Sequence, residues 1–182
     1  MKNAQRDRTT TAVLFVCTGN ICRSPTAEAV FRALVDRAGL ARSIAIDSAG
    51  THDYQLGQPA DPRAVEQARL RGYDIPDRCA RQFESEDFDR FEWILAMDMF
   101  NLSELEEQRP RDYPGHLGLF LDLVPDCRAL EVPDPYNGEA KDFERVLDLT
   151  ERGAAALLDI VRKALEAKTA APAESAKPRS PG

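Results

Sequence analysis

The chain has 182 residues, of which 43% are hydrophobic, and a formal net charge of -7 at pH 7. A chain of this length and composition can bury a core as a single domain. The negative charge argues against a protein that binds nucleic acid through a general positive surface, so any anion site must be local. The first residues are polar and no segment is apolar for long enough to span a bilayer, which predicts a cytoplasmic protein without membrane contact.

The cysteines and histidines exclude two further classes of site. There are four cysteines and two histidines. Cys17, Cys22, Cys79 and Cys127 contain no C-x2-C pair, so neither a structural zinc site nor a disulfide framework is expected. Free thiols suit a reducing compartment, and we expect no metal and no cofactor.

The first half of the chain alternates predicted strands with predicted helices. Apolar residues 13–16 indicate a buried strand, and Pro25 then opens a helix over residues 26–38, which Gly39 ends. Residues 43–49 indicate a second strand, and residues 62–71 a second helix after a loop rich in Gly and Pro.

The second half continues the alternation. Residues 93–97 and 117–121 are predicted strands, with a short helix over 100–108 between them. Residues 140–166 carry an apolar face at helical spacing and predict a final helix, with Gly153 as a candidate break. The pattern predicts a single-domain α/β fold with a four-stranded parallel sheet and helices on both faces.

The ends of the chain have the composition of flexible segments. We expect residues 1–11 to be a flexible extension and residues 12–167 to form the domain. Residues 168–182 are rich in Ala, Pro, Ser and Lys and offer little to bury, so they are expected to be a disordered tail.

The segment that carries the chemistry lies between the first strand and the first helix. It reads Cys17-Thr18-Gly19-Asn20-Ile21-Cys22-Arg23-Ser24-Pro25. Ligands of parallel sheets bind at the carboxyl ends of strands, where the following helix presents free N–H groups to an anion. Gly19 and Asn20 tolerate the left-handed backbone that turns successive N–H groups inward around a phosphate.

Cys17 and Arg23 are the candidate reactive groups of this loop. A sulfur at position 17 would lie beneath a bound phosphorus, and the N–H groups, the helix dipole and Arg23 favour its nucleophilic thiolate. The guanidinium of Arg23 matches two phosphoryl oxygens, and Ser24 could donate a hydrogen bond to the sulfur. The alternative is that Cys17 is simply a buried thiol and Arg23 a surface charge. That interpretation does not explain why the strand, the loop and Pro25 occur together.

This loop, with its flanking residues 13–31, resembles the signature of the low-molecular-weight protein-tyrosine phosphatases. The likeness runs from Thr11 to about Leu165 through Ser48-Ala49-Gly50-Thr51, Asp61-Pro62-Arg63-Ala64, Met97-Asp98 and Asp134-Pro135-Tyr136. It implies the phosphotyrosine phosphatase I-like fold and hydrolysis of phosphotyrosine through a cysteinyl-phosphate. The implied partner is a phosphotyrosine-containing protein, such as a tyrosine kinase.

The resemblance also assigns roles outside the loop. Expelling a tyrosyl oxygen requires a proton, and the resemblance implies that Asp134 supplies it, although on sequence alone an Asp between two prolines is more often a turn former. Tyr54 and Tyr136 are implied to be aromatic walls of the cleft. Ser48, through a hydrogen bond with Asn20, and Asp98 are implied to support the loop.

Ile21 and Cys22 bear on specificity and regulation. Relatives that act on phosphoarginine resemble this loop but have Thr at the position of Ile21, so Ile21 favours phosphotyrosine. Cys22 could form a protective disulfide with Cys17 or could be a buried packing thiol, and both readings stay open. Many members of the family carry a second tyrosine after Tyr136, where this chain has Asn137.

Two rival functions remain. A thiol-dependent arsenate reductase needs a closely spaced pair of additional cysteines, whereas Cys79 and Cys127 are far apart in sequence and are expected to be structural. A non-catalytic phosphotyrosine-binding module would not need Asp134.

His52 and His116 are expected at the surface without a role. The chain is expected to be a monomer or weak dimer. Its physiological substrate is left open.

Overall fold

The computed structural model describes residues 10–125 and 127–170. Along the chain the elements are β1 (Thr11–Cys17), α1 (Arg23–Arg37), β2 (Ile44–Gly50), α2 (Pro62–Leu70), α3 (Asp87–Arg90), β3 (Trp93–Ala96), α4 (Met99–Gln108), β4 (His116–Leu119), the 3-10 helix η1 (Phe120–Leu123) and α5 (Ala140–Ala170). Within these ranges no helix is long and apolar enough to cross a membrane.

The four strands form one parallel sheet in the order β2-β1-β3-β4. In the register, Cys17 at the end of β1 lies beside Gly50 at the end of β2, and Val16 lies beside Ala96 at the end of β3. The carboxyl ends of three strands therefore meet at one edge, as in the predicted α/β fold. The segment that begins with Cys17 leaves the sheet from the middle of this edge.

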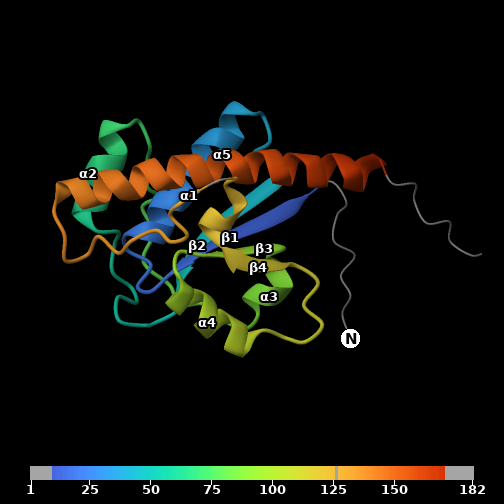
Figure 1. Ribbon diagram of the computed structural model, residues 1–182, viewed down its shortest axis with the longest axis horizontal. Helices are drawn as coiled ribbons and strands as arrows, with labels where there is room; N and C mark the ends of the chain where they lie inside the picture. The colour runs from blue at the N-terminus through green and yellow to red at the C-terminus, as the bar shows by residue number, and fades with distance from the viewer. Residues whose placement is uncertain (1–9, 126, 171–182) are drawn as a thin grey trace, which may run out of the picture.

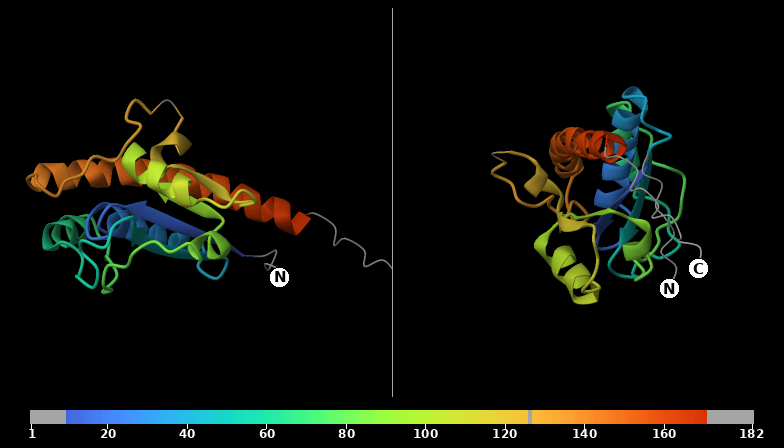
Figure 2. Two further views of the ribbon diagram at one scale, coloured as in Figure 1. Left: turned by 90° about the horizontal axis from the view of Figure 1, so that it is seen from below. Right: turned by 90° about the vertical axis from the view of Figure 1, so that its right-hand side faces the viewer.

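Both faces of the sheet are covered by helices, which confirms the predicted arrangement. Val13 and Phe15 of β1 belong to the core cluster shared with α1 and α5, whereas Leu14 and Val16 belong to the cluster shared with α3 and α4. All four side chains are fully buried. Figure 2 shows α5 and α1 on one side of the sheet and α4 on the other.

Several boundaries differ from the predictions for local reasons. Helix α1 begins at Arg23 rather than at residue 26, so Pro25 occupies the first turn, where an N–H has no helical partner. The fourth strand ends at Leu119, and residues 120 and 121, predicted to be strand, belong to η1. The short helix α3 was not predicted, because four residues are too few to show helical periodicity.

Helix α5 is continuous, so the predicted break near Gly153 is wrong. It spans Ala140–Ala170 and crosses the whole molecule (Figure 1). Gly153 is buried where η1 packs against the helix, and a Cβ there would lie 2.5 Å from Phe120 Cζ. The glycine therefore admits the Phe120 ring rather than ending the helix.

The predicted domain boundaries are modified at both ends. Strand β1 already includes Thr11, and α5 continues through residues 168–170, which were assigned to the tail. The remainder of the predicted extension and tail, residues 1–9 and 171–182, lies outside the described residues.

Candidate active site

The candidate phosphate loop, residues 17–24, links the end of β1 to the first turn of α1. Asn20 has a φ of 56°, the left-handed conformation predicted for it. Gly19 is not left-handed, contrary to the prediction. It instead allows close packing, since a Cβ there would lie 3.1 Å from Gln55 Cγ.

The sulfur of Cys17 receives hydrogen bonds from its own loop. The backbone N–H of Asn20 donates to Sγ at 3.3 Å, and the hydroxyl of Ser24 lies 3.1 Å from it. Ser24 is thus placed as the sequence predicted. Because Cys17 is only 3% exposed, these contacts replace water around the sulfur.

A chain of side-chain hydrogen bonds supports the loop from behind. The amide of Asn20 donates to Ser24 Oγ and to Ser48 Oγ, both at 3.0 Å, so the contact between Asn20 and Ser48 implied by the resemblance is present. Ser48 in turn donates to Glu28 Oε2 at 2.8 Å. The chain connects the interior of α1 to the sulfur of Cys17.

Glu28 is a supporting residue that the sequence analysis missed. It is 1% exposed, and it is paired with Arg32 at 2.8 Å and with Arg78. A buried carboxylate is stable only with such partners. The sequence offered one sign of this role: Glu28 is the single charged residue in the segment 27–31, whose other residues are apolar.

The exit from β2 packs directly against the phosphate loop. The N–H groups of Thr51 and His52 donate to the carbonyls of Cys17 and Thr18 at 2.8 and 3.0 Å. A Cβ on Gly50 would lie 2.7 Å from the Thr18 oxygen, so only glycine permits this approach. The contact holds the loop against the sheet edge.

Arg23 lies buried at the centre of a set of carboxylate and carbonyl acceptors. Its Nη1 donates to Asp98 at 2.5 Å and to the carbonyl of Val132 at 3.2 Å, and its Nη2 donates to Asp134 at 3.2 Å. Burial acts to lower the pKa of Arg23, but the nearby Cys17, Asp98 and Asp134 outweigh it and raise that pKa. The guanidinium is therefore a fixed positive charge beside the sulfur.

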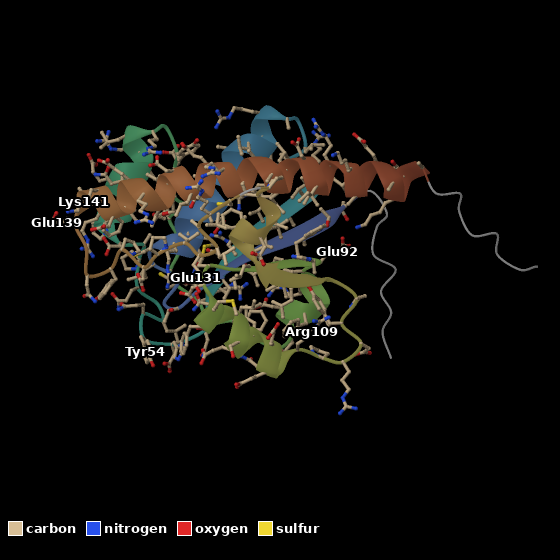
Figure 3. The ribbon with its side chains drawn as sticks, viewed as in Figure 1. Tyr54, Glu92, Arg109, Glu131, Glu139 and Lys141 are labelled. Atoms are coloured by element: carbon tan, nitrogen blue, oxygen red, sulfur yellow. The ribbon has the colours of Figure 1, made fainter. Side chains whose placement is uncertain are left out.

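The loop residues, Asp134 and the two tyrosines surround one hollow. Tyr54 and Tyr136 are 71% and 47% exposed, so they stand at its mouth, while Cys17 and Arg23 are buried. Figure 3 shows Tyr54 on the loop that follows β2, at the end of the molecule where the strands finish. The hollow is lined by Cys17, Thr18, Gly19, Ile21, Cys22, Arg23, Tyr54, Gln55, Asp134 and Tyr136.

The predicted site residues are thus brought together, in two layers. Nine of the lining residues were named from the sequence, and Gln55 was missed. Asn20, Ser24 and Asp98 do not line the hollow but form hydrogen bonds with residues that do, and Ser48 joins this set through its hydrogen bond with Asn20. Asn101 was also missed; its side-chain amide forms a hydrogen bond of 3.0 Å with Thr18 Oγ1.

The other cysteines differ in their surroundings. Cys22 is buried, and burial, together with Asp61 and Cys17, raises the pKa of its thiol. It therefore stays a protonated thiol at neutral pH. Cys79 is exposed and so does not contribute to a core, contrary to the expectation of a structural role, and neither Cys79 nor Cys127 lines the hollow.

His52 has more contacts than the sequence indicated. Its ring is stacked between those of Tyr54 and Phe100, with centroid distances of 4.7 and 5.7 Å. Its Nδ1 lies 3.2 Å from Glu104 Oε2. The ring of His52 therefore contacts Tyr54, which lines the hollow. In the described residues, no group of three or more His, Cys, Asp or Glu side chains could hold a metal ion.

Comparison with known proteins agrees with this geometry. The sequence model of the family described as low molecular weight phosphotyrosine protein phosphatase matches residues 12–170. The chain belongs to this family. A low molecular weight protein-tyrosine-phosphatase of Streptomyces coelicolor is 41% identical, over 87% of this chain and 98% of the relative.

Solved structures of the low molecular weight phosphatase family have the same fold. A protein tyrosine phosphatase from Entamoeba histolytica superimposes with a TM-score of 0.81 at 39% identity, covering 85% of this chain and 98% of that chain. A Drosophila arginine phosphatase superimposes with a TM-score of 0.77 at 28% identity, covering 82% and 97%. The same fold therefore occurs in one protein named as a tyrosine phosphatase and in another named as an arginine phosphatase.

Proposed function

We propose that this phosphatase hydrolyses phosphotyrosine with Cys17 as nucleophile, Arg23 as phosphate clamp and Asp134 as general acid. The observation that carries the proposal is the position of Arg23. It donates to Asp134 from a buried place beside the sulfur of Cys17, in a hollow whose mouth is aromatic. A phosphoryl group above the sulfur would meet the guanidinium and the acid at once.

The reaction then has two steps that balance in atoms and protons. The thiolate of Cys17 attacks phosphorus, the bond from phosphorus to the tyrosyl oxygen breaks, and Asp134 transfers its proton to that oxygen. In the second step Asp134 removes a proton from water, whose oxygen attacks the cysteinyl-phosphate. Inorganic phosphate leaves, and the Cys17 thiolate is restored.

Two features support phosphotyrosine as the substrate. Tyr54 and Tyr136 stand on the hollow as walls for a phenyl ring, and the long tyrosyl side chain can reach the buried sulfur. Ile21 adds an apolar contact inside the hollow, where phosphoarginine-directed relatives have Thr. The polar guanidinium of phosphoarginine gains less from that contact than a phenyl ring does.

We further propose a cytoplasmic protein, acting as a monomer or weak dimer on a phosphotyrosine-containing protein such as a tyrosine kinase. Cys17, Cys22, Cys79 and Cys127 are free thiols, which suits a reducing compartment. The deep sulfur and the exposed rim suit a phosphorylated side chain that projects from a protein surface.

The test is turnover of a phosphotyrosine peptide in EDTA by wild type, Cys17→Ser and Asp134→Ala, with phosphoarginine, phosphoserine and arsenate plus thioredoxin alongside. We expect phosphotyrosine turnover that is lost in Cys17→Ser and falls by about 10²-fold or more in Asp134→Ala. Consumption of arsenate alone would favour a reductase. Binding of phosphotyrosine without turnover of any substrate would favour a binding module.

A further inference from the structure

The acid loop, residues 132–138, is tied to the rest of the molecule at its start, at the Asp134 side chain, which accepts from Arg23, and in its second half. At its start, the N–H of Val132 donates to Met97 and its carbonyl accepts from Arg23. Its second half is held by Arg63, which donates from Nη2 to the Tyr136 carbonyl at 2.9 Å and from Nη1 to the Gly138 carbonyl at 3.3 Å. Within the described residues, Arg63 makes the hydrogen bonds that join 135–138 to another element.

Arg63 is itself held by the carboxylate of Asp61. Its Nε and Nη2 donate to the two oxygens of Asp61 at 3.0 and 2.7 Å, and its backbone N–H donates to Oδ1 at 2.8 Å. Hydrogen bonds from Arg63 lower the pKa of Asp61, so the pair stays ionised at neutral pH. A bidentate pair of this kind fixes the direction of the guanidinium plane.

Asp61 links Arg63 to the phosphate loop. The backbone N–H of Asp61 donates to the carbonyl of Ile21 at 2.8 Å, and the Cys22 thiol lies against the Asp61 carboxylate. One short path therefore runs from the loop that carries Cys17, through Asp61 and Arg63, to the loop that carries Asp134. It joins residues that are far apart in sequence.

Aromatic rings hold the guanidinium from its faces. The guanidinium carbon of Arg63 lies 4.7 Å from the ring centroid of Phe143 and 5.9 Å from that of Tyr136. Phe143 is buried in the first turns of α5 with Ile21, Cys22 and Ala64. Lysine could not reproduce this arrangement, because it has neither a planar fork nor a face that stacks.

We propose that Arg63 is a positioning residue that sets the place of the general acid relative to the nucleophile. The proposal rests on the proposed function, in which Asp134 protonates the leaving oxygen. Arg63 does not line the hollow; it acts through the backbone of residues 136 and 138, which follow the acid in the same short loop. Loss of these contacts frees the loop and displaces the carboxyl group, which weakens proton transfer.

The proposal predicts a leaving-group effect that a merely structural role would not give. A poor leaving group such as phenol needs the proton of the acid, whereas dinitrophenol leaves almost without it. Arg63→Met keeps an unbranched side chain and removes every hydrogen-bond donor of the guanidinium. We expect it to lower kcat/KM for phenyl phosphate about tenfold or more, and kcat/KM for dinitrophenyl phosphate by less than about twofold.

The matched control is Arg69→Met on the same helix, because among the described residues the side chain of Arg69 is paired with the exposed Glu66 alone. It should leave kcat/KM for both substrates unchanged. Arg63→Lys, which keeps the charge and is the second variant should Arg63→Met fail to fold, should retain part of the rate on phenyl phosphate. Thermal unfolding of each variant identifies those that fold.

A double-variant cycle with Asp134→Ala separates this proposal from the proposed function. In the Asp134→Ala background, Arg63→Met should cause no further loss on phenyl phosphate, because the acid it positions is gone. Equal losses on both substrates, or full additivity with Asp134→Ala, would overturn the role of Arg63. If Asp134→Ala itself affects both substrates equally, the acid assignment in the proposed function fails, and the Arg63 proposal fails with it.

Discussion

Replacing Gly153 by alanine tests how closely α5 packs on the rest of the core. A Cβ at this position would lie 2.5 Å from Phe120 Cζ and 2.8 and 2.9 Å from its two Cε atoms. Carbon atoms in contact prefer about 3.5–4.0 Å, so the ring would have to move by about 1 Å. Phe120 is fully buried, and its ring meets that of Phe15 edge-on at a centroid distance of 5.2 Å.

Two effects of opposite sign compete in this substitution. Alanine stabilises a helix interior by about 1 kcal/mol relative to glycine. Overpacking of a filled core costs about 1–3 kcal/mol. Because the ring has no free space to enter, we place the packing term at the upper end of this range and expect Gly153→Ala to destabilise the fold by about 1–2 kcal/mol.

The assay is urea unfolding, with the midpoint and the slope measured together. Lys163→Ala is the control, because Lys163 is exposed on the same helix, and it should change the free energy of unfolding by less than about 0.5 kcal/mol. Gly153→Ala combined with Phe120→Leu should lose less than the sum of the single losses. A Gly153→Ala variant more stable than wild type would refute the reasoning.

Three further predictions concern the site. Glu28→Gln removes the charged acceptor of Ser48, so kcat/KM should fall about tenfold as the phosphate loop loosens; an unchanged value in steady-state kinetics would contradict this. Tyr54→Ala should raise KM for an aryl phosphate about three- to tenfold with little change in kcat, whereas a fall in kcat alone would argue against a wall. Hydrogen bonds from Arg63 lower the pKa of Asp61 in the folded protein. The pairing therefore contributes its full stabilisation above about pH 3.9, the ordinary pKa of an aspartate in an unfolded chain. This stabilisation is lost as the pH falls through the lower folded pKa, so urea midpoints of wild type and Arg63→Met should converge in acid and differ by a constant amount near neutrality.

The elements that the sequence predicted well are those whose signal is local. Residues 13–16 form a continuous apolar run because both faces of β1 are buried, and they were identified as a buried strand. The loop from Cys17 to Arg23 could be assigned because its residues follow one another between a strand and a helix. The start of α1 was missed by three residues, since Arg23 and Ser24 carry polar side chains that face the site rather than solvent.

The contacts that the sequence could not predict join distant residues. Arg23 bonds Asp98 and Asp134 across separations of 75 and 111 residues, and Arg63 bonds Tyr136 across 73. No periodicity carries such information. The position of Asp134 between two prolines indicates a turn residue, and only the resemblance to the family predicted a role as general acid.

The two carboxylate partners of Arg23 bear on how a phosphate would bind to its guanidinium. Its two carboxylate partners differ, since the Asp98 side chain is 20% exposed and bonds at 2.5 Å, whereas that of Asp134 is 51% exposed and bonds at 3.2 Å. A phosphate dianion that binds Arg23 displaces Asp134 from Nη2 more readily than it displaces Asp98 from Nη1. In the proposed mechanism, phosphate therefore takes the place of Asp134 on the guanidinium. Binding of the anion would thus release the Asp134 side chain toward the leaving oxygen, while Asp98 holds Arg23 in place.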